Sequence, residues 1–223
     1  MANPFATEST DVVVIGLGRF GSAVALSLSQ LGHQVLAIEE DPGKVQAYSD
    51  RLSHVVQADA TDPHALHRLG VDSFNHAIVA IGTDLEASVL TVLALSEVGV
   101  ADIWAKALQD RHGRILERTG AHHVIYPEAA MGERVAHLIT GKVIDFIEFE
   151  DNFAIVKTAA PEEALGKTLG ASGLRTKYGV TIVGVKRKGD PFTYATAETV
   201  VEDGDFLIVA GQTRACEHFA SRT

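Results

Sequence analysis

Three glycines followed by an acidic residue form the strongest chemical signal in this sequence. Gly16, Gly18 and Gly21 have the G-x-G-x-x-G spacing within "VVVIGLGRFG", and Glu39 follows near the expected ~20-residue interval. The first glycine permits a tight turn, the second lets the backbone approach a phosphate, and the third lets a helix pack closely on a strand. Glu39 can accept hydrogen bonds from ribose hydroxyls, and its charge disfavours a 2′-phosphate. The pattern predicts a nucleotide site, the alternative being a turn required for packing alone.

Four charged residues extend this prediction. Arg19 lies inside the glycine turn and Lys106 ends the segment "DIWAK", so both can neutralise phosphate. The alternative for each is an ordinary charged side chain on the solvated surface. Glu128 follows Pro127 and fits the first turn of a helix, where a carboxylate complements the helix dipole. Near phosphates, Glu128 would instead need a bridging cation or an arginine partner. Asp59, in "QADATD", is expected either beside the base or in an ordinary turn.

The elements that must position these residues alternate regularly along the first part of the chain. Apolar runs predict strands at 11–15, 34–39, 54–58, 76–81, 102–107 and 122–126. Helical patterns are expected at 19–31, from 41, at 62–70, at 84–99, at 110–120 and from 127. This alternation predicts an α/β fold with a doubly wound, Rossmann-like parallel sheet.

After about residue 141 the pattern changes to alternating strands with few helices. Strands are predicted at 145–150, 152–159, from 179 and at 203–211, with helices at 165–174 and 213–220. We therefore expect a flexible tail at 1–10, a nucleotide-binding domain at 11–141 and a smaller α+β domain at 142–223.

Composition excludes several classes of function. The chain has a net charge of −10, so it lacks the excess of basic residues that is typical of a nucleic-acid or anionic-lipid binder. No apolar run approaches the ~18 residues of a membrane span, and the first residues do not resemble a secretion signal. A lone cysteine, Cys216, cannot form an internal disulfide, which fits a reducing cytoplasm.

The sequence shows no arrangement of residues typical of catalysis. His122 and His123 are adjacent on a strand and point to opposite faces, so they cannot chelate one ion together. His64 and His67 have helical spacing that would allow a shared metal, but a polar surface helix is the better explanation. We predict no catalytic residues and a binding protein rather than an enzyme.

Motifs across the whole chain resemble those of bacterial RCK proteins (regulators of conductance of potassium), in particular the KtrA/TrkA type. In chain order the matching pieces include "VIGLGRFG", "ADATD", "IVAIG", "IWAKA", "YPEAAMG", "LRTKYG" and "EDGDFLIVAG". Glu39 departs from the aspartate that close relatives often carry, a change that preserves a ribose-binding carboxylate.

The resemblance implies a cytosolic subunit that gates a membrane potassium transporter of the KtrB/TrkH type. ATP would activate and ADP inactivate through the shape of an octameric ring of homodimers, and residues 131–141 would form a crossover helix. Glu128 would help bind Mg²⁺ or Ca²⁺ at the dimer interface, and Arg175 would contact the phosphates of cyclic di-AMP, although a solvated arginine fits equally. The nucleotide-binding residues are expected to be Gly16, Gly18, Arg19, Phe20, Gly21, Glu39, Asp59, Ala60, Thr61, Gly82 and Lys106.

Other classes of function share parts of this pattern. An NAD(H)-dependent oxidoreductase or an NAD(H)-sensing regulator would carry the same glycines and Glu39. An interaction scaffold with a vestigial site would bind no nucleotide.

Overall fold

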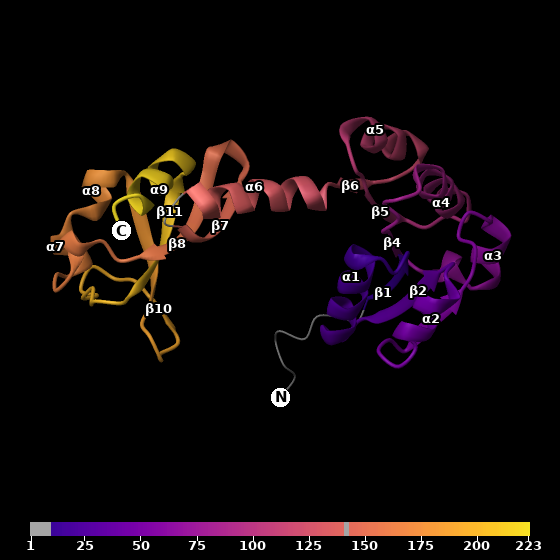
Figure 1. Ribbon diagram of the computed structural model, residues 1–223, viewed down its shortest axis with the longest axis horizontal. Coiled ribbons are helices and arrows are strands. Elements are labelled where there is room, and N and C mark those ends of the chain that lie inside the picture. The colour runs from indigo at the N-terminus through magenta and orange to yellow at the C-terminus, as the bar shows by residue number, and fades with distance from the viewer. Residues whose placement is uncertain (1–9, 141–142) are drawn as a thin grey trace. The chain divides into compact units, whose positions relative to one another are not determined.

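The computed structural model describes residues 10–140 and 143–223 and divides into two compact units, Met1–Glu128 and Ala129–Thr223 (Figure 1). Most of the predicted tail at 1–10, and the predicted domain boundary at 141 and 142, lie outside the described residues. Most of helix α6 (Pro127–Thr140) falls in the second unit, whereas the sequence analysis grouped this helix with the first domain.

The first unit contains a six-stranded sheet in the order β3-β2-β1-β4-β5-β6, and the pairs between neighbouring strands are parallel. The strands are β1 (Asp11–Ile15), β2 (Gln34–Glu39), β3 (His54–Gln57), β4 (His76–Val79), β5 (Asp102–Lys106) and β6 (His123–Ile125). The helices between them are α1 (Arg19–Gln30), α2 (Pro42–Tyr48), α3 (Pro63–Arg68), α4 (Leu85–Glu97) and α5 (Asp110–Thr119), with a short 3-10 turn, η1 (Val71–Ser73). The predicted doubly wound α/β fold is confirmed.

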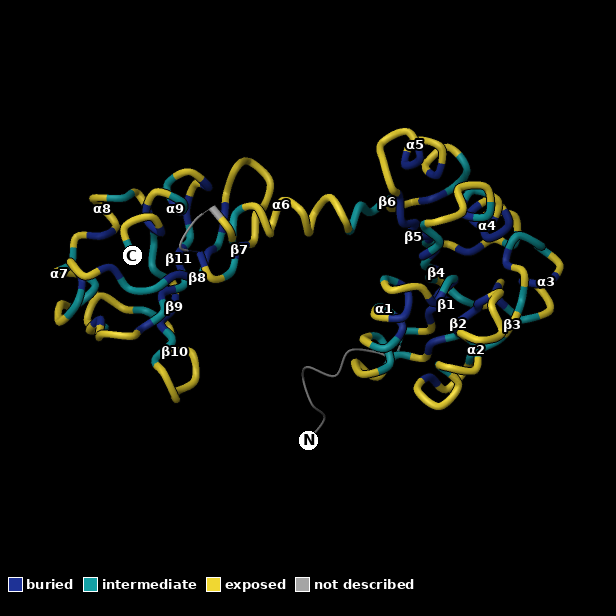
Figure 2. The backbone as a smooth tube through the Cα atoms, viewed as in Figure 1, coloured by how far each residue is buried: buried dark blue, intermediate teal, exposed yellow. Residues whose placement is uncertain are grey.

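Both faces of this sheet are covered because its strands are apolar on both sides. Along β1, Val13 and Ile15 belong to a core that includes apolar residues of α3, α4 and α5. The alternate residues Val12 and Val14 belong to a second core with residues of α1 and α2. Figure 2 shows the resulting buried strands between partly exposed helices.

Aspartates begin three of the helices, because a carboxylate can accept a bond from a free N–H group of the first turn. Asp41 accepts from Gly43 and Lys44 at the start of α2. Asp62 caps α3 and Asp84 caps α4 in the same way. These caps fix where the loops above the strand ends turn into helices.

The second unit is built on a five-stranded sheet in the order β10-β9-β11-β8-β7, with antiparallel neighbours. Its strands are β7 (Val143–Phe149), β8 (Phe153–Ala159), β9 (Val180–Lys186), β10 (Phe192–Tyr194) and β11 (Phe206–Gln212). Its short helices are η2 (Glu150–Asn152), η3 (Glu162–Ala164), α7 (Leu169–Ser172), α8 (Leu174–Tyr178) and α9 (Thr213–Ala220). The predicted smaller α+β domain is confirmed.

Two details of the second unit differ from the sequence analysis. The helix expected at 165–174 begins only at Leu169 and is broken at Gly173, whose positive φ of 67° separates α7 from α8. The strand β10 was not predicted as a separate element. Its three residues are all exposed, so it lacks the buried alternation that marks a strand in a sequence.

Candidate functional site

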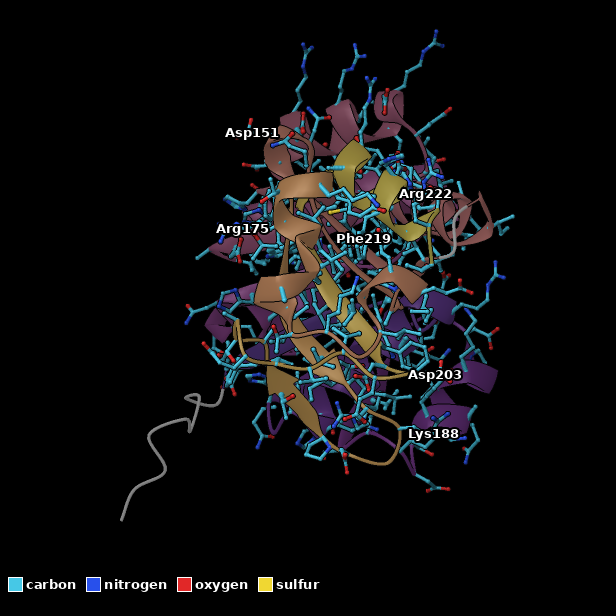
Figure 3. All side chains as sticks on the ribbon, turned by 90° about the vertical axis from the view of Figure 1, so that its left-hand side faces the viewer. Asp151, Arg175, Lys188, Asp203, Phe219 and Arg222 are labelled. Carbon is cyan, nitrogen blue, oxygen red and sulfur yellow. The ribbon has the colours of Figure 1, made fainter. Side chains whose placement is uncertain are left out.

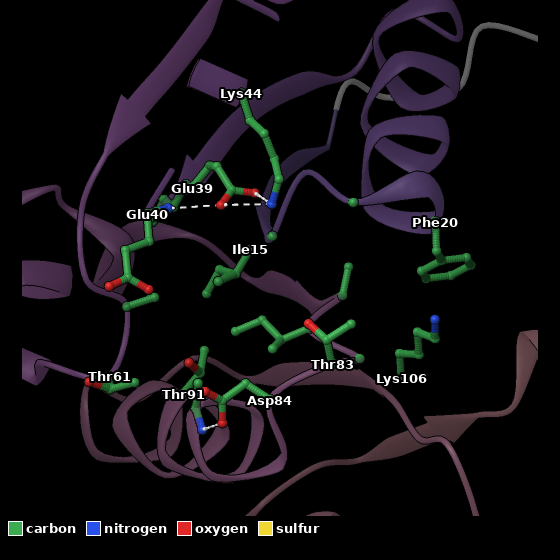
Figure 4. Close-up of a pocket in the computed structure, with 18 of the residues that line it drawn as sticks. Ile15, Phe20, Glu39, Glu40, Lys44, Thr61, Thr83, Asp84, Thr91 and Lys106 are labelled. Carbon is green, nitrogen blue, oxygen red and sulfur yellow. Dashed lines mark hydrogen bonds and ion pairs between the residues drawn. The ribbon is translucent and has the colours of Figure 1, made fainter. Parts of the chain in front are cut away.

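A pocket of about 570 Å³ lies at the carboxyl ends of the first five strands of the first unit (Figure 4). The sheet order reverses between β1 and β4, which is where open α/β sheets bind ligands. Of the predicted nucleotide-binding residues, those that line it are Gly16, Gly18, Arg19, Phe20, Glu39, Asp59, Ala60, Thr61, Gly82 and Lys106; the predicted cation ligand Glu128 lines it too.

The glycine turn has the geometry that an approaching phosphate requires. Gly16 has a φ of 91°, which side chains rarely adopt, and a Cβ on Gly18 would meet nothing within 4 Å. Open space beside Gly18 therefore faces the start of α1, where first-turn N–H groups lack helical partners. Gly21 does not line the pocket. A Cβ there would lie 1.9 Å from the carbonyl oxygen of Gly16, so Gly21 serves helix packing.

Glu39 is buried and heavily hydrogen-bonded. Its Oε2 accepts from the Leu17 N–H at 2.6 Å, and its Oε1 accepts from the N–H groups of Glu40 and Asp41, both at 3.1 Å. The Lys44 ammonium lies 3.3 Å from Oε1 and 3.2 Å from Oε2. The carboxylate therefore also fixes the glycine turn, a role that sequence reasoning missed together with Lys44.

Charged residues gather at the other end of the pocket. Lys106 is only 8% exposed, and its Nζ lies 2.6 Å from Oε1 of Glu128 and 5.9 Å from the centre of the Phe20 ring. This hydrogen bond, together with the positive charges of Lys106 and Arg19, lowers the pKa of the Glu128 carboxyl. The Glu128 side chain is 62% exposed, so Lys106 reaches from the interior toward a carboxylate at the rim.

The far side of the pocket is formed by the segment after β3 and by α4. Asp59 accepts hydrogen bonds from the hydroxyl and the N–H of Thr61, and these bonds lower the pKa of Asp59. Asp84 and Thr91 of α4 also line this side, and the buried Thr91 hydroxyl has no partner within the described parts of the chain. Sequence reasoning missed both residues as parts of the site.

The structure places the remaining predicted site residue, Arg175, in the second unit. It is exposed on α8 (Figure 3) and is not among the residues that line the pocket at the strand ends. The second unit has an open hollow of about 510 Å³. The residues that line it are Pro161, Glu162, Glu163, Lys177, Tyr178, His218 and Arg222. Arg175 is not among its lining residues.

Within residues 10–140 and 143–223, no three His, Cys, Asp or Glu side chains are grouped so that they could hold a metal ion. None of the helices in that part of the chain combines the length and the apolar character needed to cross a membrane.

The fold and this pocket define a protein with a Rossmann-like domain suited to a nucleotide. Residues 12–127 match the family model of the TrkA-N domain, and residues 153–222 match that of the TrkA-C domain. The chain therefore belongs to the TrkA-N/TrkA-C family, which confirms the resemblance found in the sequence.

Similar proteins include potassium uptake components. The chain is 38% identical to "Ktr system potassium uptake protein C" of Bacillus subtilis, covering 95% of this chain and 96% of that protein. It is 34% identical to "Ktr system potassium uptake protein A" of Vibrio alginolyticus, covering 92% and 94%. The solved GsuK RCK domain has the same fold, with a TM-score of 0.66 and 22% identity over 98% of this chain, which spans about half (49%) of that structure. One GsuK structure, 21% identical with a TM-score of 0.65 over 97% of this chain and 40% of that one, is described as bound to NAD.

Proposed function

We propose that this chain is a cytosolic regulatory subunit that gates a membrane potassium transporter in response to an adenine nucleotide. The observation that carries the proposal is the pocket at the strand ends, with a glycine turn, a carboxylate at Glu39 and the cations Arg19 and Lys106. The likeness to Ktr potassium uptake proteins over almost the whole chain supplies the potassium system. We propose binding and a change of shape, with no reaction on the nucleotide.

The order of residues along the pocket suggests how a nucleotide lies. The segment Asp59–Thr61 would flank the base, Glu39 the ribose, and the turn around Gly18 the first phosphates. Lys106 would then meet the phosphates that ADP and ATP share, and Arg19 the terminal phosphate of ATP. Phosphate oxygens are strong acceptors for both side chains, since charge-assisted hydrogen bonds are about twice as strong as neutral ones.

ATP and ADP differ by one phosphate, so residues at this end must distinguish them. A ligand shifts a conformational equilibrium only by the difference in its affinity for the two states. In our proposal, homodimers assemble into an octameric ring. ATP favours the active shape of this ring, and ADP favours its inactive shape. Glu128 and the phosphates would share Mg²⁺ or Ca²⁺, because carboxylate and phosphate oxygens suit these hard cations.

Within this proposal the chain lies in the cytoplasm and reaches the membrane through its partner, a potassium-translocating subunit of the KtrB/TrkH type. The second unit would add a further regulatory input. Its exposed Arg175 would contact the phosphates of cyclic di-AMP.

Calorimetry on the purified full-length chain tests the nucleotide part of this proposal. ATP, ADP, NADH and cyclic di-AMP are titrated separately, with and without Mg²⁺ or Ca²⁺. We expect ATP and ADP to bind, and ATP to respond more strongly to the cation. Binding of NADH alone would favour the NAD(H)-sensing alternative. Turnover of NADH with a metabolite would favour an oxidoreductase, and a chain that binds none of the four would be a scaffold.

Potassium flux tests the gating part. The chain is reconstituted with a Ktr-type membrane subunit in potassium-loaded vesicles, and flux is compared in ATP and in ADP. We expect faster flux in ATP. Equal flux in both nucleotides, with the two subunits demonstrably associated, would contradict the proposed gating.

A further inference from the structure

The carboxylate expected to recognise ribose already holds a lysine. The Lys44 Nζ lies within hydrogen-bond distance of both Glu39 oxygens, at 3.3 Å and 3.2 Å, and both residues line the pocket (Figure 4). Lys44 is the third residue of α2 and lies in its first turn, just after the Asp41 cap. An ammonium group therefore lies at the place where a ribose diol would bind.

Glu39 has no spare acceptor for a ligand while Lys44 is present. An ionised carboxylate offers about four lone-pair sites. Three of them are used by the backbone N–H groups of Leu17, Glu40 and Asp41. Lys44 contacts both oxygens, so ribose hydroxyls must compete with it.

The two partners of this ion pair differ in their freedom to move. The Glu39 side chain is 8% exposed and is held by the turn of its own loop and by the glycine turn, whereas the Lys44 side chain is 46% exposed. Swinging Lys44 into solvent breaks its two contacts with Glu39 and lets water solvate the ammonium group, whereas moving Glu39 would break three backbone hydrogen bonds. A ligand therefore displaces Lys44.

We propose that Lys44 is a built-in competitor for the ribose diol, which lowers the affinity of the pocket for ribonucleotides and its preference for them over 2′-deoxy ligands. This inference rests on the proposed nucleotide function and names the residue that tunes its sugar site. A ligand with both hydroxyls recovers the hydrogen bonds that Lys44 gives up. A 2′-deoxy ligand replaces fewer of them and can leave Lys44 on one oxygen.

The test is calorimetric titration of the full-length chain with ADP and with 2′-deoxy-ADP, for wild type and Lys44→Met. Because the Lys44 end of this ion pair is 46% exposed, the pair is weak, and we expect ADP to bind about two- to fivefold more tightly to the variant. The ratio of the two dissociation constants should rise by a similar factor in favour of ADP. Weaker ADP binding would show that Lys44 contacts the ligand and would overturn the proposal. An unchanged affinity, or an equal change for both ligands, would overturn it as well.

A second variant tests the competition in the opposite direction. Lys44→Arg keeps a cation on Glu39 and adds the paired donors that suit a carboxylate. This variant should bind ADP no more tightly than wild type, and tighter binding would contradict the proposal even if Lys44→Met fails to fold. Lys188→Met, which removes an exposed lysine in the turn before β10, is the matched control for the loss of one positive charge. If wild type binds neither nucleotide, the proposed function fails first, and this inference fails with it.

Discussion

Replacing Lys106 with methionine should separate ligand binding from stability. Methionine keeps an unbranched apolar stem of similar length beside Phe20 and beside the face of Gly82 that has no side chain. It removes the ammonium group. The partner carboxylate of Glu128 is 62% exposed and can return to water. Because such ion pairs contribute little, we expect the free energy of unfolding at pH 7 to change by less than about 1 kcal/mol.

The loss in phosphate binding should be much larger. Lys106 is only 8% exposed, so its ammonium can meet a phosphate with little competing water. Hydrogen bonds to charged groups contribute about 1.5–3 kcal/mol, which corresponds to a change of about 10- to 150-fold in a dissociation constant. We expect the lower part of this range for ADP, because Lys106 must give up its 2.6 Å bond to Glu128 when it binds a phosphate.

The assay is calorimetry with ADP, accompanied by thermal unfolding of both proteins without ligand. Lys188→Met again controls for net charge. If Lys106→Met unfolds like wild type and binds ADP within threefold of it, Lys106 makes no contact with phosphate and the assigned orientation of the nucleotide is wrong.

Three further predictions test the turn, a buried histidine and the terminal-phosphate end. Gly21→Ala places a methyl group 1.9 Å from a backbone oxygen and should cost about 3 kcal/mol of unfolding free energy. In Gly113→Ala the added methyl group meets a tyrosine hydroxyl that can turn away, so this substitution should cost less. Equal losses of stability in chemical denaturation would contradict this expectation. Burial lowers the pKa of His112, so the unfolded chain binds a proton more readily and stability falls as the pH drops below about 6.5. His112→Leu should make the loss of stability between pH 7 and 5 shallower, and unfolding curves with the same pH dependence as wild type would refute the assignment. Arg19→Ala should reduce the preference for ATP over ADP severalfold, because its guanidinium lines the end of the pocket assigned to the last phosphate; calorimetry giving the wild-type affinity ratio would count against that role.

The sequence alone determined the class of fold and the region of the pocket. Apolar runs with helical patterns between them specify a parallel sheet, and all of its strands place their carboxyl ends at one edge. Residues at or just after the ends of those strands, such as Lys106 and Asp59, therefore had to gather there whatever their side chains contact. Aspartates before helical runs marked the helix starts through local bonding.

The tertiary structure alone decided which side chains bind one another inside the pocket. Leu17 and Glu39 are 22 residues apart, as are Lys106 and Glu128, and each pair meets only because neighbouring strands lie in register. Thr91 lines the pocket because its helix, α4, packs against the sheet beside the strand ends. Spacing along a chain encodes turns, caps and the periodicity of buried faces. The partner of a charged group depends on packing between distant segments, and no local pattern records it.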